Sequence, residues 1–503
     1  MIKRLALILL VVPLFTYGQK GKKVLKQQNN NLENYRPAYH FSPKSGWMND
    51  PNGLVYLDGE YHLFFQHNPD QPVWGPMHWG HAISTDLIHW KELPIALFPD
   101  SLGTIFSGSA VVDKGNTAGF GKDALVAIYT NHSHEIEKKK TGVHQTQSIA
   151  YSLDKGKTWI KYKGNPVIAN PGIWDFRDPK VSWHKETGQW IMALATKQSI
   201  TFYGSKDLKV WGKLSEFGTG IGAHGGVWEC PDLIRFNTKE GEKWVLLVSI
   251  NPGGPNTGSA TQYFVGSFDG HTFTTDQKDI RWMDYGPDNY AGVTFSNTDE
   301  RNLLIGWMSN WEYANQVPSE TWRSGNTIVR ELGLVKNETG WMLTSTPVAE
   351  LDKISKSVLK SKNIPVNKTT DLSKAFAQLG NTVDASFALD NLVDFKVELS
   401  NEDGDRLIFG FDKKKNEYFI DRSKAGETNF SDKFITNPVA PRTVKAVGSD
   451  LRFLLDRNSI ELFADNGMTV MSALFFTKKA FTQLVIRTNE HVVLKDFSVK
   501  KVN

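Results

Sequence analysis

Residues 53–66 read Gly-Leu-Val-Tyr-Leu-Asp-Gly-Glu-Tyr-His-Leu-Phe-Phe-Gln and predict a β-hairpin. Hydrophobic and β-branched residues fill both halves, and Asp58-Gly59 lies between them in the pattern of a tight two-residue turn. Similar short runs, bounded by Gly, Asn and Asp, continue from residue 40 onward, whereas helical periodicity is nearly absent. The sequence therefore predicts an all-β protein.

A weak repeat spaces these hairpins along the chain. It begins as Ser84-Thr-Asp-Leu-Ile-His-Trp90 and returns at 152–159, 205–211 and 267–273, with a Ser two residues before an Asp and an aromatic residue four or five later. The intervals from Ser to Ser are 68, 53 and 62 residues. Periods of about 50–60 residues with several strands each favour the blades of a β-propeller. Four unrelated hairpins that share turn chemistry are the alternative.

The pattern changes near residue 345. We expect the propeller domain to cover residues 35–345, a helical or irregular linker to cover 346–365, and a second domain to cover 366–503. Seven short strands in the last part are typical of a β-sandwich, and we expect them at 383–389, 395–399, 407–411, 417–421, 451–456, 460–464 and 470–476. No cluster of acids, His or aromatic residues there suggests chemistry, so a structural role is expected, with carbohydrate binding as the second reading.

The N-terminus predicts export. Lys3 and Arg4 precede an apolar run of 11 residues, 5–15, which is too short to span a bilayer and reads as a signal peptide (1–18) cleaved near residue 18. Residues 19–34 form a polar, flexible lead-in. The product is expected to be periplasmic or secreted, without membrane insertion after cleavage. A net charge of +4 on 503 residues is too small to indicate nucleic-acid binding, and a single Cys excludes an intramolecular disulfide. Nothing in the sequence fixes the oligomeric state.

Three acidic residues share one local context. Asp50-Pro51, Asp178-Pro179 and Glu229-Cys-Pro231 each precede a similar pair of strands. If these are equivalent positions in three blades, the carboxylates converge on the propeller axis and share one pocket. Convergent carboxylates suit cleavage of a glycosidic bond, which needs one nucleophile and one proton donor. A lone acid near a turn would otherwise be a solvated cap or an ion-pair partner.

Rival chemistries are less consistent with the sequence. A divalent metal could use the acids with some of the His residues, but the HExxH and EF-hand patterns are absent, so we expect no catalytic metal and no cofactor. Cys230 is expected to be a buried packing residue rather than a thiol nucleophile. A metal-dependent phosphoesterase and a non-catalytic carbohydrate-binding protein are the alternatives from other functional classes.

Seven motifs resemble those of glycoside hydrolase family 32, the β-fructofuranosidases, and occur in the family's order. They begin at Trp47-Met-Asn-Asp-Pro-Asn-Gly53 and continue at 64–69, 74–81, 106–109, 176–179, 228–232 and 306–311. The resemblance implies a five-bladed β-propeller followed by a β-sandwich. It also implies that Asp50 is the nucleophile, Glu229 the general acid/base and Asp178 a transition-state stabiliser.

The same resemblance implies a first fructosyl subsite. Its expected lining is Asn49, Asn52, Gln66, Trp74, Phe106, Ser107, Arg177 and Trp311. The expected substrate is a fructan (levan, inulin or fructo-oligosaccharides) or a sucrose-type sugar, cleaved with retention and in an exo manner that releases fructose. A sucrose-directed invertase and an endo-levanase are alternatives, and residue identity does not separate hydrolysis from fructosyl transfer.

Overall fold

The hairpin predicted at 53–66 forms at the start of the first sheet. The computed structural model describes residues 35–503, so the predicted signal peptide and lead-in lie outside the described residues. Strands β1 (Gly46–Leu57) and β2 (Glu60–Asn68) pair in antiparallel fashion with Leu57 opposite Glu60. Asp58 and Gly59 adopt φ of 49° and 90°, as a type I′ turn requires.

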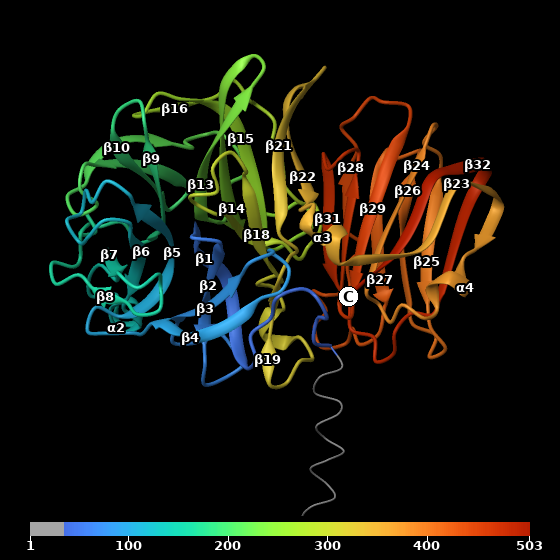
Figure 1. The fold of residues 1–503 in the computed structure, drawn as a ribbon, viewed down its shortest axis with the longest axis horizontal. Helices are drawn as coiled ribbons and strands as arrows, with labels where there is room; N and C mark the ends of the chain where they lie inside the picture. The colour runs from blue at the N-terminus through green and yellow to red at the C-terminus, as the bar shows by residue number, and fades with distance from the viewer. Residues whose placement is uncertain (1–34) are drawn as a thin grey trace, which may run out of the picture.

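Five antiparallel sheets form the blades of a propeller (Figure 1). The first contains β1, β2, β3 (His78–Ser84) and β4 (Lys91–Leu97), and the second β5 (Thr104–Asp113), β6 (Ala124–His132), β7 (Gln145–Ser152) and β8 (Ile160–Lys161). The third contains β9 (Phe176–His184), β10 (Gln189–Thr196), β11 (Ser199–Ser205) and β12 (Gly212–Phe217). The fourth contains β13 (Val227–Thr238), β14 (Gly241–Asn251), β15 (Ala260–Phe268) and β16 (Phe273–Thr274). The predicted all-β propeller is confirmed.

The fifth blade contains β17, β18, β21 and β22, with bounds Tyr290–Thr294, Leu303–Met308, Arg330–Asn337 and Gly340–Pro347. Two short strands complete the propeller: β19 (Trp322–Arg323) runs parallel to β1, and β20 (Gly325–Asn326) pairs with β18. Two helical segments lie in its connections, α2 (His134–Lys139) and the 3-10 turn η1 (Ala314–Gln316).

The Ser-x-Asp repeat marks the turn between the third and fourth strands of the first four blades. In the first, the Ser84 hydroxyl donates to Asp86 at 3.0 Å, and Asp86 accepts backbone N–H groups of Ile88 and His89 at 3.0 and 2.8 Å. The equivalent Ser–Asp hydrogen bonds at 152–154 and 205–207 measure 2.8 and 3.2 Å. The repeat is therefore a self-capped turn that places the fourth strand at the outer edge of each blade.

Hydrogen bonds between innermost strands close the ring of blades. The Gly108 N–H of β5 donates to Asn52 of β1, Ser109 of β5 donates to the Pro179 carbonyl of β9, and the Cys230 N–H of β13 donates to Asp178 of β9. Asp232 of β13 accepts from Thr294 of β17. Ser296, two residues after β17, exchanges backbone hydrogen bonds with β1. The strands β1, β5, β9, β13 and β17 therefore surround the axis in that order.

The C-terminal domain is a β-sandwich, as predicted. Its strands are β23 (Ser355–Asp371), β24 (Val383–Leu389), β25 (Phe395–Ser400), β26 (Arg406–Asp412), β27 (Glu417–Lys424), β28 (Val439–Pro441), β29 (Ser449–Asp456), β30 (Ser459–Ala464), β31 (Thr469–Leu474) and β32 (Gln483–Val502). The long β32 pairs with β25 through 483–488 and with β24 through 495–501, so it belongs to both layers. Apolar side chains from both groups of strands pack in one core.

The segment 346–365, which was expected to be a helical or irregular linker, contains a short helix and the start of a long β-strand. Helix α3 (Glu350–Ile354) is followed at once by β23, which pairs with β32 along nearly its whole length, and α4 (Ser373–Phe376) comes after it. β23 is an edge strand whose side chains are mostly exposed and include several Lys. Charged side chains protect exposed strand edges from pairing with other chains. Because β23 therefore lacks the alternation of apolar and polar residues, the sequence pattern did not predict it as a strand.

The two domains meet across a buried polar interface. His40, close to the first blade, hydrogen-bonds Asp456 at 2.8 Å and Glu461 at 2.7 Å, and Arg330 bridges Glu461 and Asp284. Burial alone would lower the pKa of His40, but the hydrogen bonds to the two carboxylates raise it to about 9. The buried charges are thus paired across the interface, which fixes the orientation of the domains.

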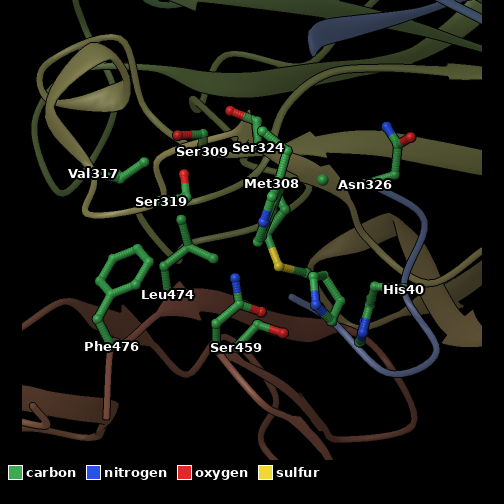
Figure 2. Close-up of a pocket in the computed structure, with 14 residues that line it drawn as sticks. His40, Met308, Ser309, Val317, Ser319, Ser324, Asn326, Ser459, Leu474 and Phe476 are labelled. Carbon is green, nitrogen blue, oxygen red and sulfur yellow. The ribbon is translucent and has the colours of Figure 1, made fainter. Parts of the chain in front are cut away.

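A small cavity lies beside this network. Figure 2 shows propeller side chains, among them Met308 and Ser319, facing Ser459 and Leu474 of the C-terminal domain. Its volume of 20 Å³ is about the space that one buried water needs. Within residues 35–503, no helix has the length and apolarity needed to cross a lipid bilayer.

Candidate active site

Each innermost strand carries a β-bulge at the same level of the propeller. The registers place two residues opposite one partner residue at 49–50, 106–107, 178–179, 230–231 and 291–292. A bulge re-aims the side chains around it, and Pro is tolerated at bulges because it cannot donate to the ladder. Pro179 and Pro231 lie within their bulges, whereas Pro51 directly follows the 49–50 bulge. The acid-and-Pro motif found in the sequence is therefore the signature of a bulge in three of five blades.

The bulges open onto one pocket of 300 Å³. It brings together all the predicted site residues except Asn52: Asn49, Asp50, Gln66, Trp74, Phe106, Ser107, Arg177, Asp178, Glu229 and Trp311. Its lining also includes His132, Glu137, Gln145, Asp175, Val227 and Asn251. Five carboxyl groups face one guanidinium in this lining, so the pocket favours a substrate that develops positive charge and disfavours an anionic one.

Asp50 is held by three hydrogen-bond donors. The Ser107 hydroxyl donates to Oδ2 at 2.6 Å, the Asn49 amide donates to Oδ1 at 2.9 Å, and the Cys230 thiol lies 3.5 Å from Oδ2. Asn49 is itself fixed, because the Trp47 indole donates to its Oδ1 at 2.8 Å. Burial raises the pKa of Asp50, and the hydrogen bonds from Ser107 and Asn49 oppose this by stabilising the carboxylate.

Asp178 lies deeper and has fewer partners. Its backbone adopts φ of 66° within the bulge, and its Oδ2 accepts the Cys230 N–H at 3.0 Å and faces the Cys230 thiol at 3.6 Å. Burial raises the pKa of Asp178 to about 7; the charge of Arg177 opposes this, whereas Glu229 and Asp50 reinforce it. Burial also raises the pKa of the Cys230 thiol well above its usual value, so Cys230 stays protonated and packs between two carboxyl groups, as a non-nucleophilic Cys should.

Glu229 is oriented by a cation and a phenol. Arg177 donates from Nε and Nη2 to Glu229 Oε1 at 3.1 and 3.0 Å, and its Nη1 donates to Asp175 at 2.7 Å. Tyr290 of β17 donates its hydroxyl to Glu229 Oε2. Burial and the charge of Glu229 raise the pKa of Tyr290 well above its usual value, so the phenol remains a donor. Arg177 pairs with Glu229 and Asp175, and not with Asp178.

Aromatic rings form one wall of the pocket. Trp74 is 39% exposed and meets the edge of Phe106, which stacks on His132 with ring centroids 4.1 Å apart. Trp311 stacks on the buried Trp47. An apolar wall opposite a cluster of carboxyl groups is the arrangement that a sugar ring requires, with polar groups on its hydroxyls and rings against its C–H faces.

Asn52 differs from the sequence expectation. It is fully buried and does not line the pocket: its amide donates to the Asp50 carbonyl at 2.8 Å, and its Oδ1 accepts the Gly108 N–H at 3.0 Å. It ties the first blade to the second directly behind Asp50. Both polar groups of the Asn52 side chain are thus engaged by backbone groups, so neither is left to bind a sugar hydroxyl.

Several residues in the pocket and directly behind it were missed by sequence reasoning. Tyr290 has no acid-and-Pro context, and only its position before the fifth bulge could have indicated it. Asp175, Gln145 and Asn251 lie at blade ends with no distinctive spacing. The expectation that the chain has no His-x-His flanked by acids is wrong, because His132-Ser-His-Glu-Ile-Glu137 is such a sequence and is a pattern of metal ligands.

Asp178→Asn is expected to stabilise the fold at high pH. Because the folded-state pKa of about 7 exceeds the ordinary value of 3.8, ionising Asp178 costs folding free energy above pH 7, and this cost disappears as the pH falls toward 4. The neutral variant should therefore melt at least about 2 °C above the wild type at pH 8, with the gain shrinking at pH 5. Thermal unfolding at both pH values measures this. A variant that melts below the wild type at pH 8 would contradict it.

Comparisons with known proteins agree with this geometry. The family model for the glycosyl hydrolases family 32 N-terminal domain matches residues 40–347, and the model for the family 32 C-terminal domain matches residues 350–501. The chain is 46% identical over 467 residues to a levanase of Bacillus subtilis (89% of this chain, 67% of that protein). It is 40% identical over 486 residues to an extracellular exo-inulinase of Aspergillus awamori (88% and 89%).

Two solved structures have the same fold. The crystal structure of the exo-inulinase from Aspergillus awamori superposes with a TM-score of 0.84 at 36% identity, covering 93% of this chain and 98% of that one. The β-fructofuranosidase from Schwanniomyces occidentalis, complexed with fructosyl-erythritol, superposes with a TM-score of 0.83 at 35% identity, covering 94% and 98%.

Proposed function

This chain belongs to glycosyl hydrolase family 32 and is a glycosidase of β-fructofuranosides, and from this premise we propose that it is an exported, exo-acting fructan hydrolase. The observation that carries the proposal is the convergence of Asp50, Asp178 and Glu229 in one pocket at the propeller axis. Carboxyl groups with different partners can take different protonation states, which a double displacement needs.

The reaction we propose has two steps. Glu229 protonates the leaving oxygen while Asp50 attacks the anomeric carbon C2 through an oxocarbenium-like state, and water then resolves the fructosyl-enzyme with Glu229 as the base. Ser107 and Asn49 hold Asp50, and Arg177 and Tyr290 hold Glu229. Retention requires the two carboxyl groups to be about 5–5.5 Å apart.

The remaining residues would bind and stabilise the fructosyl unit. Asp178 would accept hydrogen bonds from its hydroxyls and offset developing positive charge at C2. Gln66 lies directly across from the 49–50 bulge and would donate to a hydroxyl. Trp74, Phe106 and Trp311 would contact the apolar faces of the sugar and limit how far it enters.

Substrate and cleavage mode follow from pocket size and relatives. A pocket of 300 Å³ lies at the lower end of ligand sites, which suits a terminal fructosyl residue better than a long stretch of polymer. The levanase and the exo-inulinase support levan and inulin as substrates. The second candidate is endo cleavage, favoured by 38% identity to a levanbiose-producing levanase of Bacillus subtilis. Invertase activity on sucrose is a further alternative, since an invertase of Debaryomyces hansenii is 37% identical.

The other functional classes fit the pocket less well. A phosphoesterase substrate is anionic and would meet five carboxyl groups and one Arg. A non-catalytic binding protein has no need for a hydrogen-bonded Asp50 next to an oriented Glu229. For localisation, the basic and apolar segment at residues 3–15 and the extracellular exo-inulinase relatives support export with cleavage near residue 18.

Product analysis tests the cleavage mode. Incubated with levan, inulin or sucrose, the enzyme should release fructose from the first minutes on at least one fructan, with no accumulation of intermediate oligomers, because a pocket of 300 Å³ suits a terminal fructosyl residue. Chromatography of early time points measures this. An early ladder of oligosaccharides would establish endo cleavage instead, and turnover of sucrose alone would establish an invertase.

A further inference from the structure

A cluster of three possible metal ligands lies at the rim of the pocket. His132 ends β6, and His134 and Glu137 lie one turn apart on α2, directly after it. His132 Nε2 lies 3.2 Å from His134 Nδ1 and 3.2 Å from Glu137 Oε2, and the last two atoms are 3.8 Å apart. Among residues 35–503, this is the group of three His, Cys, Asp or Glu side chains whose ligand atoms come within 4.8 Å of one another.

The spacing of these atoms matches the coordination sphere of a small divalent ion. A circle through atoms 3.2, 3.2 and 3.8 Å apart has a radius of about 2.0 Å, which is the length of a Zn–N or Zn–O bond. Two imidazoles and one carboxylate are a ligand set that Zn²⁺ uses, with a fourth position left open. We propose that His132, His134 and Glu137 form a zinc site at the rim of this pocket, whose ligands do not include Asp50, Asp178 or Glu229.

The site is accessible and adjoins the aromatic wall. The side chains of His134 and Glu137 are 37% and 42% exposed, so an ion can enter from solvent, whereas His132 is buried behind them. The His132 ring stacks on Phe106, and the His134 ring meets the edge of Trp74. Bound Zn²⁺ would therefore hold α2 against the pocket wall and fix the rings that face the substrate.

The groups that hydrogen-bond the two His ligands favour zinc coordination by His134 and oppose it at His132. His134 Nε2 lies 3.4 Å from the Thr104 hydroxyl, and a proton on Nε2 leaves Nδ1 free for the metal. At His132, the Gln145 amide nitrogen faces Nδ1 at 3.2 Å, and Gln145 Oε1 is committed to the Phe176 N–H at 2.7 Å. Coordination through Nε2 moves the His132 proton to Nδ1, where it faces a donor instead of an acceptor. The site therefore binds zinc, but below its full strength.

This mismatch supplies a sharp test. Gln145→Glu keeps the shape of the side chain and replaces the opposing amide by a carboxylate, which can accept from both Phe176 N–H and His132 Nδ1–H. A carboxylate behind a metal-bound His changes metal affinity about 10–100-fold. Zinc affinity should therefore rise by that factor in Gln145→Glu and fall at least tenfold in Glu137→Gln and in His134→Ala.

Calorimetric titration of ZnCl₂ into the chelator-treated full chain measures these affinities, and the zinc-dependent rise in melting temperature provides a second readout. His89→Ala is the matched control. It removes an exposed His that is paired with a carboxylate in the first blade, away from the proposed site, and should leave zinc binding unchanged. Absence of one-to-one binding, equal affinity in Glu137→Gln and the wild type, or no gain in Gln145→Glu would each overturn the site. These readouts do not depend on fructan hydrolysis.

Discussion

Asp50→Asn is expected to abolish fructose release, with kcat falling by at least about 10³-fold, because the variant lacks the carboxylate that we propose attacks C2. The substitution keeps side-chain shape, and neighbouring donors at Ser107 and Asn49 remain, so the fold should persist. Initial rates on inulin and levan, together with the melting temperature of the purified variant, measure the effect.

Asp58→Asn is the matched control, because Asp58 directly follows the same strand and lies in the exposed hairpin turn, where Asn is equally able to adopt positive φ. It should retain wild-type kcat. A folded Asp50→Asn variant that hydrolyses fructan at a rate within tenfold of the wild type would remove Asp50 from the role of nucleophile.

Glu229→Gln should lower kcat on fructans by about 10²–10⁴-fold, the contribution of a general acid/base. The loss should depend on the leaving group, because a β-fructofuranoside whose leaving group needs no protonation can still form the fructosyl-enzyme. Azide should then accelerate turnover by attacking the intermediate without base assistance. Rates with natural and activated substrates, with and without azide, measure this pattern.

The control for this variant is Glu242→Gln, which changes an exposed Glu on the neighbouring strand and should leave both rates unchanged. An equal loss on natural and activated substrates, with no response to azide, would show that Glu229 binds or positions the sugar rather than transferring a proton.

Much of the fold could be predicted because its signals are local. The Asp58-Gly59 turn and the Ser-x-Asp turns are built from hydrogen bonds within a few residues, so their sequence patterns are sufficient. The edge strand β23 could not be predicted, because its partner β32 lies more than 100 residues away and its exposed side chains carry no apolar alternation.

The site was partly predictable for a similar reason. The acid-and-Pro motif marks a bulge, and equivalent bulges on different blades must face the same axis, so three distant carboxyl groups could be placed together. The hydrogen-bond partners of these acids within the protein could not be predicted. Three of these features depend on how one blade packs against the next. They are the pairing of Arg177 with Glu229, the hydrogen bond from Tyr290 to Glu229, and the burial of Asn52 against Gly108.

The most direct test of the central claim is to identify the residue that carries the fructosyl group. The Glu229→Gln variant, mixed with an activated β-fructofuranoside, quenched in acid and digested, should yield one peptide with the added mass of a single fructosyl unit, and fragmentation should place it on Asp50. Absence of any adduct while the activated substrate is consumed, or an adduct on Asp178, would contradict the double displacement proposed for this pocket.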